Sequence, residues 1–310
     1  MAYDGQYSIH RISLKRMSDT KPEGLPPTTM AGASVLFIFF WASGFIAAKF
    51  GLPYAEPFTF LTLRFLVALA ILVPLAMLWR ARWPSTPRAI GHVIVAGLLV
   101  QTIYLIGVFY GVFLGISTGV IALIVGLQPL ITGALAAPVL GERVTARQWG
   151  GLALGFAGLG LVVAEKVDLA SGQAWGAAFG VLALAGITLG TLYQKRFCPD
   201  IDIRAAVTIQ NGVSCVVIAL LAVNVETMVI NWTGEFVFAL LWSGIGLSVI
   251  AIALYYLLVR RGAAAKVTSL IYLSPPTTAV MGWLMFDETF APVAILGMII
   301  AVAGVALANR

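Results

Sequence analysis

Residues 127–145 read LQPLITGALAAPVLGERVT, and residues 273–289 read LSPPTTAVMGWLMFDET. In each stretch a glutamate follows a proline by thirteen residues, as Glu142 follows Pro129 and Glu288 follows Pro275. The two stretches are 146 residues apart, and the same shift aligns further pairs: Gly44 with Gly190, Lys49 with Lys195, Tyr110 with Tyr256, Gly151 with Gly297, and Gly158 with Gly304. Because one shift serves the chain from its first apolar run to its last, the sequence predicts two related halves.

Composition indicates a membrane protein. The 310 residues are 60% hydrophobic and 10% charged, whereas soluble domains carry about 25% charged residues. A membrane-spanning helix needs about 20 mostly apolar residues. The apolar runs predict ten transmembrane helices, at 30–50, 58–79, 90–112, 117–138, 147–164, 174–195, 205–223, 236–258, 265–286 and 292–308. The predicted fold class is therefore an all-α integral membrane protein.

The basic residues predict the orientation of these spans, since cytoplasmic loops are enriched in Lys and Arg. Nearly all of the 19 Lys and Arg residues fall in alternate loops. Only Lys49 and Lys166 fall in the other loops, and Arg64 lies inside a span. We therefore expect both termini in the cytoplasm and the protein in the cell inner (plasma) membrane. The predicted parts are a disordered cytoplasmic tail at 1–29, a first five-helix half at 30–165 and a second at 174–310. An odd number of spans in each half places the second half upside down.

Short motifs accompany the repeat. The first span carries Trp41-Ala42-Ser43-Gly44, and the second carries Arg64-Phe65. With the two proline segments, these motifs make the chain resemble the drug/metabolite transporter superfamily, in its ten-helix EamA-type branch. Within that branch it looks most like bacterial exporters of aromatic and other neutral amino acids. The resemblance covers residues 30–310 and implies secondary transport through two inverted five-helix repeats. Ser274 departs from the pattern, because some relatives have an acid before the proline.

Polar side chains inside the spans predict a substrate cavity. Such residues are costly in a bilayer and usually face the bundle interior. With the deep aromatic residues, they give a candidate lining of Trp41, Ser43, Arg64, Gln101, Tyr104, Gln128, Gln210, Asn211, Ser248, Tyr272 and Ser274. For each uncharged residue, a hydrogen bond between helices is the competing interpretation. Arg64 either anchors a substrate carboxylate or extends its long stem to the membrane surface.

Prolines and acids bear on the transport mechanism. Pro129, Pro275 and Pro276 fall near the middle of two equivalent spans, where a proline frees a carbonyl and kinks the helix. Equivalent kinks predict gating, and rigid kinks for packing are the alternative. Glu142 and Glu288 lie at span ends and are expected to cap or pair locally. No Asp or Glu lies at the centre of a predicted span, so we expect transport without strong proton coupling.

These patterns favour a secondary transporter that exports small neutral metabolites by alternating access, most of all amino acids including aromatic ones. A multidrug or organic-cation exporter is one alternative, and it would need a cavity acid. An intramembrane enzyme is another, and no nucleophile stands beside a base in the sequence. We therefore expect no enzymatic activity, no cofactor, no metal and no nucleic acid. The expected partners are a small-molecule substrate and the lipid bilayer, and the small residues of spans five and ten allow a homodimer contact.

Overall fold

A computed structural model of the chain describes residues 27–140, 145–166, 173–251, 254, 258 and 273–308. These residues form helices joined by short loops, with one isolated bridge between Ala55 and Ile230. The helices are α2 (Pro27–Gly51), α3 (Pro57–Leu78), α4 (Pro87–Gly97), η1 (Leu98–Ile103), α5 (Tyr104–Phe113), α6 (Thr118–Gly126), α7 (Gln128–Leu140), α8 (Ala146–Lys166), α9 (Gln173–Phe197), α10 (Ile203–Val225), α11 (Gly234–Leu241), η3 (Trp242–Ala251), α14 (Ser274–Phe286) and α15 (Pro292–Ala308). Residues 1–26 of the predicted tail lie outside the described residues.

Eight helical stretches of the described chain are long and apolar enough to cross a membrane. They begin at Ala31, Pro57, Pro87, Thr118, Ala146, Gln173, Ile203 and Gly234. These stretches coincide with the first eight predicted spans, which are confirmed as helices over their described residues, in the eighth as far as Ala251. The apolar part of α15, Pro292–Leu307, is shorter. Residues 265–272 of the ninth predicted span lie outside the described residues, and α14 covers the remainder from Ser274. The chain is thus an all-helical, multi-pass membrane protein, and a count of ten spans stays a prediction.

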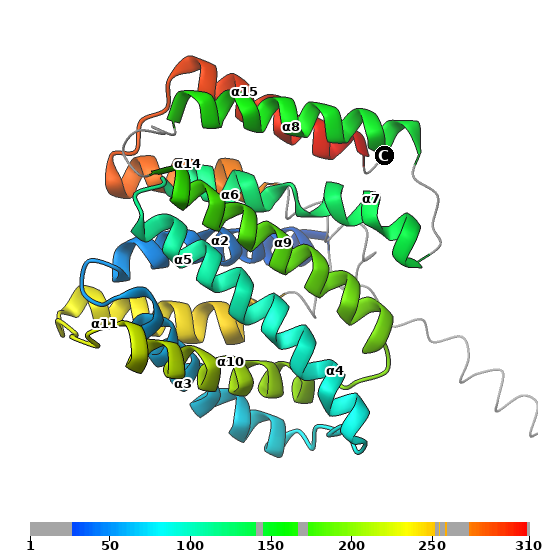
Figure 1. Ribbon diagram of the computed structural model, residues 1–310, viewed down its shortest axis with the longest axis vertical. Helices are drawn as coiled ribbons and strands as arrows, with labels where there is room; N and C mark the ends of the chain where they lie inside the picture. Colours follow the sequence, from blue (N-terminus) through cyan, green and yellow to red (C-terminus); the bar gives the residue numbers. More distant parts are fainter. Residues whose placement is uncertain are drawn as a thin grey trace, which may run out of the picture.

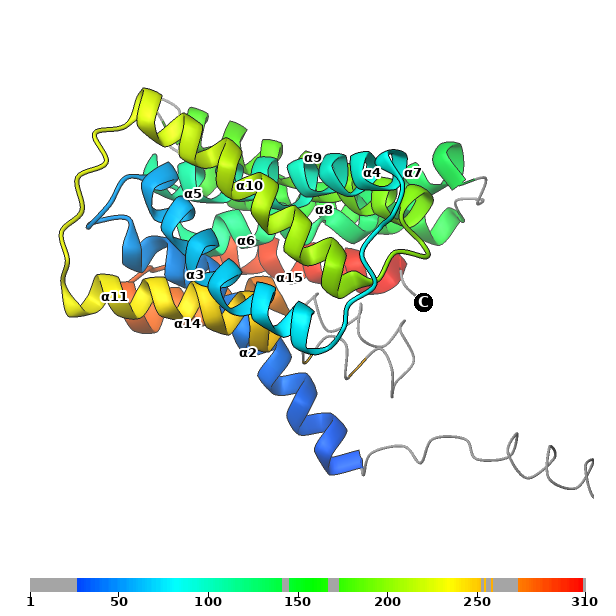
Figure 2. The same cartoon turned by 90° about the horizontal axis from the view of Figure 1, so that it is seen from below.

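The helices stack in layers. In Figure 1, α8 and α15 lie side by side at one end of the bundle, while α3 and α10 pack together towards the other end. Helices α2, α5, α6 and α9 lie between these two pairs. Figure 2 shows that the first turns of α2 project beyond the bundle.

Glycines allow α8 and α15 to touch backbone to backbone. A Cβ atom added at Gly158 would overlap the carbonyl oxygen of Gly297, and one added at Gly304 would lie 2.6 Å from the carbonyl oxygen of Gly151. Because Gly158 meets Gly297 while Gly151 meets Gly304, the two helices run antiparallel. Small residues at this spacing bring membrane helices close, where dispersion contacts replace the missing hydrophobic force.

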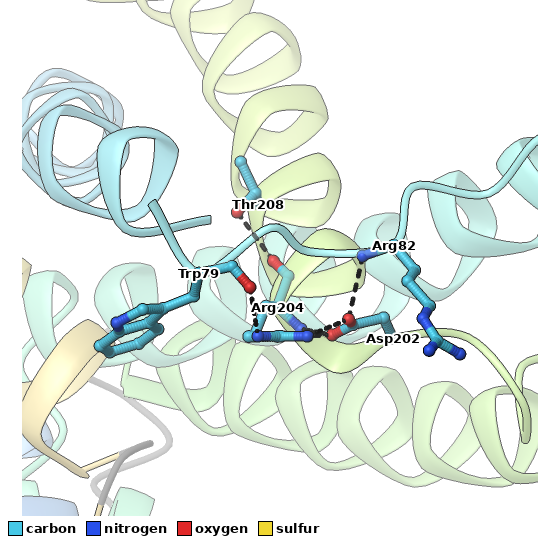
Figure 3. Close-up of polar contacts among 5 residues, drawn as sticks. All are labelled: Trp79, Arg82, Asp202, Arg204 and Thr208. Atoms are coloured by element: carbon cyan, nitrogen blue, oxygen red, sulfur yellow. Dashed lines mark hydrogen bonds and ion pairs between the residues drawn. The ribbon is translucent and has the colours of Figure 1, made fainter. Parts of the chain in front are cut away.

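Polar contacts at both ends hold α3 against α10. At the start of α3, the carboxylate of Glu226 accepts hydrogen bonds from the backbone N–H groups of Phe58 and Thr59, each at 2.8 Å. At the opposite end, the guanidinium of Arg204 donates to the carbonyl oxygen of Trp79 at 2.9 Å (Figure 3). The start of α3 therefore lies beside the end of α10, so this pair also runs antiparallel.

Two stretches of wider, π-helical turns interrupt the α-helices. They are η1, between α4 and α5, and η3, which continues α11. A shift of 146 residues places η1 onto residues 244–249 inside η3, so the two wide segments occupy equivalent positions in the chain. Turns of this kind are frequently found at functional sites.

The predicted gating prolines each lie in the first turn of a helix. Helix α6 ends at Gly126 and α7 begins at Gln128, which places Pro129 in the first turn of α7. Pro275 and Pro276 likewise fall in the first turn of α14. A proline is well tolerated there because its missing N–H would have no intrahelical partner. At Pro129 a one-residue break at Leu127 separates α6 from α7 within the helical stretch that begins at Thr118. The residues just before Leu273 lie outside the described part of the chain, and kinking and gating by these prolines stay predictions.

The close crossing of α8 and α15 gives a matched pair of glycine substitutions. We expect Gly158→Ala to destabilise the protein by about 1–3 kcal/mol, because the added methyl overlaps backbone. Gly160→Ala is the control, since a Cβ there meets nothing within 4 Å. Thermal unfolding in detergent measures both variants, and equal melting temperatures for the two would contradict the glycine contact.

Candidate functional site

A cavity of about 170 Å³ lies among α2, α3, η1, α5, α9, α10 and η3. Six of its lining residues were predicted from the sequence: Trp41, Arg64, Gln101, Tyr104, Asn211 and Ser248. The other lining residues are small or apolar: Gly44, Phe45, Val100, Leu105, Val108, Phe109, Ile187, Leu247 and Ala251. The site thus combines one cation, several neutral polar groups and an apolar wall.

Both halves of the chain contribute equivalent positions to this cavity. Three pairs of lining residues are 146 positions apart: Trp41 and Ile187, Gln101 and Leu247, and Leu105 and Ala251. The cavity therefore lies where the two halves meet. The π-helical segments η1 and η3 both reach it, through Gln101 and Leu247 among others.

Arg64 is the ionised lining residue. Its side chain lies within the bundle, with 8% of the residue exposed, instead of extending to the surface. Its Nε atom is buried and has no hydrogen-bond partner, and no ion pair to its guanidinium occurs among the described residues. The Tyr104 side chain lies close enough to interact electrostatically with this guanidinium. As a neutral phenol it does not balance the charge of Arg64. An unpaired buried cation is costly, so this arrangement favours the arrival of an anion.

Four other predicted residues do not line the cavity. Ser43 donates to the Phe40 carbonyl oxygen at 2.8 Å and accepts from Trp242 Nε1 at 2.8 Å, and Gln128 donates to Thr191 at 3.2 Å. For Ser43 and Gln128 the structure thus favours helix-to-helix hydrogen bonds. Gln210 and Ser274 are buried, and each has a side-chain atom without a partner in the described structure. Tyr272 lies outside the described residues.

Two glutamates not singled out from the sequence join the halves. Glu226 follows α10 and, besides capping α3, accepts from Thr59 Oγ1 at 2.8 Å and from the Tyr110 hydroxyl at 3.2 Å. Glu56 precedes α3 and accepts from the N–H and hydroxyl of Thr227, each at 2.7 Å. Anions are stabilised at helix N-termini by the free N–H groups and the helix dipole. The one signal in the sequence is an acid in each of these two loops, and it does not identify the partners.

Glu288 has the structural role predicted for it, but with distant partners. Its carboxylate pairs with Lys49 Nζ at 2.7 Å and accepts from the N–H and hydroxyl of Thr118, at 3.1 and 3.0 Å. It therefore caps the start of α6 in the other half instead of the helix that follows it. Glu142, its equivalent in the first half, lies outside the described residues.

Asp202 organises the end of the α3–α10 pair opposite Glu226 (Figure 3). Its carboxylate pairs with the Arg204 guanidinium at 2.6 Å and accepts from the backbone N–H groups of Arg204 and Arg82, each at 3.0 Å. The hydrogen bond from the Arg204 side chain, followed by the backbone donors, holds the pKa of Asp202 well below its usual value. The cluster joins the loop after α3 to the start of α10.

Comparison with known proteins identifies the family. The model of the EamA-like transporter family matches residues 29–164 and again residues 174–310. The chain therefore belongs to the EamA-like transporter family, within the drug/metabolite transporter superfamily, and carries its characteristic unit twice.

Similar proteins share this length and fold. The chain is 26% identical to an uncharacterized transporter, YvbV, of Bacillus subtilis, over 92% of this chain and 93% of that protein. It is 25% identical to a probable terminal-alkyne amino-acid exporter of Streptantibioticus cattleyicolor, over 90% and 92% of the two chains. A solved crystal structure, 19% identical, superposes with a TM-score of 0.64 over 91% of this chain and 97% of its own, which supports the fold.

The Asp202 cluster predicts a pH dependence of stability. A carboxyl group with a depressed folded-state pKa stabilises the fold above its unfolded pKa, and this stabilisation is lost as the pH falls below about 4. We expect Asp202→Asn to lower the free energy of unfolding at pH 7 by about 0.2–1 kcal/mol, the modest contribution of a partly exposed ion pair. The melting temperature should fall accordingly. The deficit should shrink at pH 3. Asp200→Asn, at an exposed carboxylate two residues away, is the control, and a pH-independent deficit in Asp202→Asn would contradict the ion pair.

Proposed function

We propose that this protein is a secondary transporter that exports small, carboxylate-bearing metabolites, including neutral and aromatic amino acids. The observation that carries the proposal is the unpaired guanidinium of Arg64 in a cavity between the two halves. A substrate carboxylate is the planar, bidentate anion that a guanidinium binds best. The rings of Trp41 and Tyr104 supply apolar faces for the remainder of the substrate. Export of an amino acid is also the activity named for one relative, the probable terminal-alkyne amino-acid exporter.

We further infer ten spans arranged as two inverted halves. Helices α3 and α10 are equivalent under the shift of 146 residues, as are α8 and α15, and each pair runs antiparallel. Opposite directions of equivalent helices are what inversion requires. Inverted repeats place the substrate site between the halves and change access by rocking one half against the other. The basic loops support cytoplasmic termini and an inner-membrane location.

Size and charge distinguish this proposal from drug export. The cavity of about 170 Å³ is smaller than the 300–1,000 Å³ typical of drug-sized pockets. Its described lining contains no Asp or Glu to pair with an organic cation. The same lack of an acid supports transport without strong proton coupling, because Glu226 and Glu288 are engaged at helix N-termini. A homodimer through α8 and α15 is compatible with their exposed apolar side chains, such as Phe156 and Ile299.

Counterflow in proteoliposomes tests the proposal. Vesicles are loaded with unlabelled phenylalanine or leucine, and entry of the labelled amino acid is followed with and without an imposed pH gradient. We expect protein-dependent entry at the same rate in both conditions. Ethidium, an organic cation, should not enter.

A pair of tryptophan substitutions, one in the cavity lining and one on an exposed face, tests whether this cavity carries the substrate. Leu247→Trp adds volume to the cavity lining, whereas Val181→Trp adds the same side chain to the exposed face of α9. We expect at least a tenfold loss of counterflow in the first variant and little change in the second. Entry of ethidium without any amino acid would favour the drug-exporter alternative, and entry that requires the pH gradient would contradict the uncoupled mechanism.

A further inference from the structure

The cavity has an excess of positive charge. Arg64 lines it with no acidic residue among the described lining. Residues 252–272, which continue the chain after the lining residue Ala251, contain no Asp or Glu in their sequence. The acids nearest the helices that line the cavity hold other partners, since Glu226 caps α3 and Glu288 pairs with Lys49. A substrate therefore meets, in the described lining, a net charge of one positive unit without an acidic counter-ion.

The positive charge of Arg64 favours the binding of a small anion over that of a zwitterion. A small carboxylate pairs with Arg64 and leaves the cavity neutral. An amino acid brings the same carboxylate together with an ammonium group, so the positive excess remains. Its ammonium finds only neutral acceptors in the described lining: Gln101, Tyr104, Asn211 and Ser248. Asn211 donates its amide N–H to the Val207 carbonyl oxygen at 2.8 Å, which leaves its neutral amide oxygen as the acceptor. Burying an ion without a counter-ion is costly even where hydrogen bonds are available.

We propose that the cavity selects for negative net charge, so that small apolar monocarboxylates without an ammonium group bind more tightly than the amino acids of the same side chain. The inference rests on the proposed function and narrows its substrate class. The cavity of about 170 Å³ is small, which favours a compact acid over a drug-sized one. Trp41, Phe45 and Phe109 provide the apolar wall for that tail.

Three ligands built on the same 2-phenylethyl group test this selection. 3-Phenylpropionate carries only the carboxylate, phenylalanine carries both charges, and phenethylamine carries only the ammonium. Binding to the full-length protein in detergent is measured at pH 7.4 by calorimetry, because weak acids cross vesicle membranes unaided. We expect 3-phenylpropionate to bind at least tenfold more tightly than phenylalanine, and phenethylamine not to bind.

Variants at Arg64 test the cause of the preference. Arg64→Gln should remove the advantage of 3-phenylpropionate, and Arg64→Lys should retain part of it. Arg88→Gln, which removes an equal charge from an exposed position, should leave the ligand order unchanged. If Arg64→Gln fails to give a single species on gel filtration, the ligand series with the unmodified protein still decides the question.

Phenylalanine binding as tightly as 3-phenylpropionate would overturn the charge selection, while Arg64-dependent counterflow of phenylalanine would leave the proposed function intact. Binding of none of the three ligands would overturn the selection, and the absence of counterflow as well would overturn the proposed transporter function. Preferential binding of phenethylamine would assign the cavity to organic cations.

Discussion

The bilayer supplies no hydrogen-bond partners, so every polar group within it must be satisfied by the protein. Helices satisfy most backbone groups, and their N-termini need acceptors from elsewhere. Glu226 and Glu288 provide them across the bundle, at the starts of α3 and α6. Arg64 differs from these satisfied groups, because its guanidinium is unpaired and lies in the cavity between the halves. An unsatisfied charge in such a place is best understood as one kept for a ligand.

Two kinds of helix contact hold the bundle together. At the α8–α15 crossing the backbones approach closely at glycines, which gives this contact close dispersion interactions. The α3–α10 pair is instead fastened at its ends, by Glu226 at one and by Arg204 and Asp202 at the other (Figure 3). Hydrogen bonds at the two ends can open separately while the middle stays packed. The π-helical segments η1 and η3 bring wide, adaptable turns to the cavity from both halves.

Periodic and compositional features were predictable from the sequence, and long-range partners were not. Apolar runs predicted eight helices that the structure confirms, because length and hydropathy are local properties. Mid-span polarity selected Arg64, Gln101 and Asn211, which line the cavity in the structure. It could not separate them from Gln128, whose partner Thr191 lies on another helix. Glu226 and Phe58 are 168 residues apart, and no local pattern joins them. The wide turns of η1 and η3 leave no signature in residue spacing.

Distances between spin labels test most directly whether the two halves rock about the cavity. In a protein whose buried cysteines Cys198 and Cys215 are replaced by serine, labels at Pro53 and Met228 report on the Glu226 end of the α3–α10 pair, and labels at Ser85 and Asp200 report on the Asp202 end. Alternating access predicts that substrate changes the two distances in opposite directions. Distances that stay the same at both ends, or that lengthen together, would contradict it.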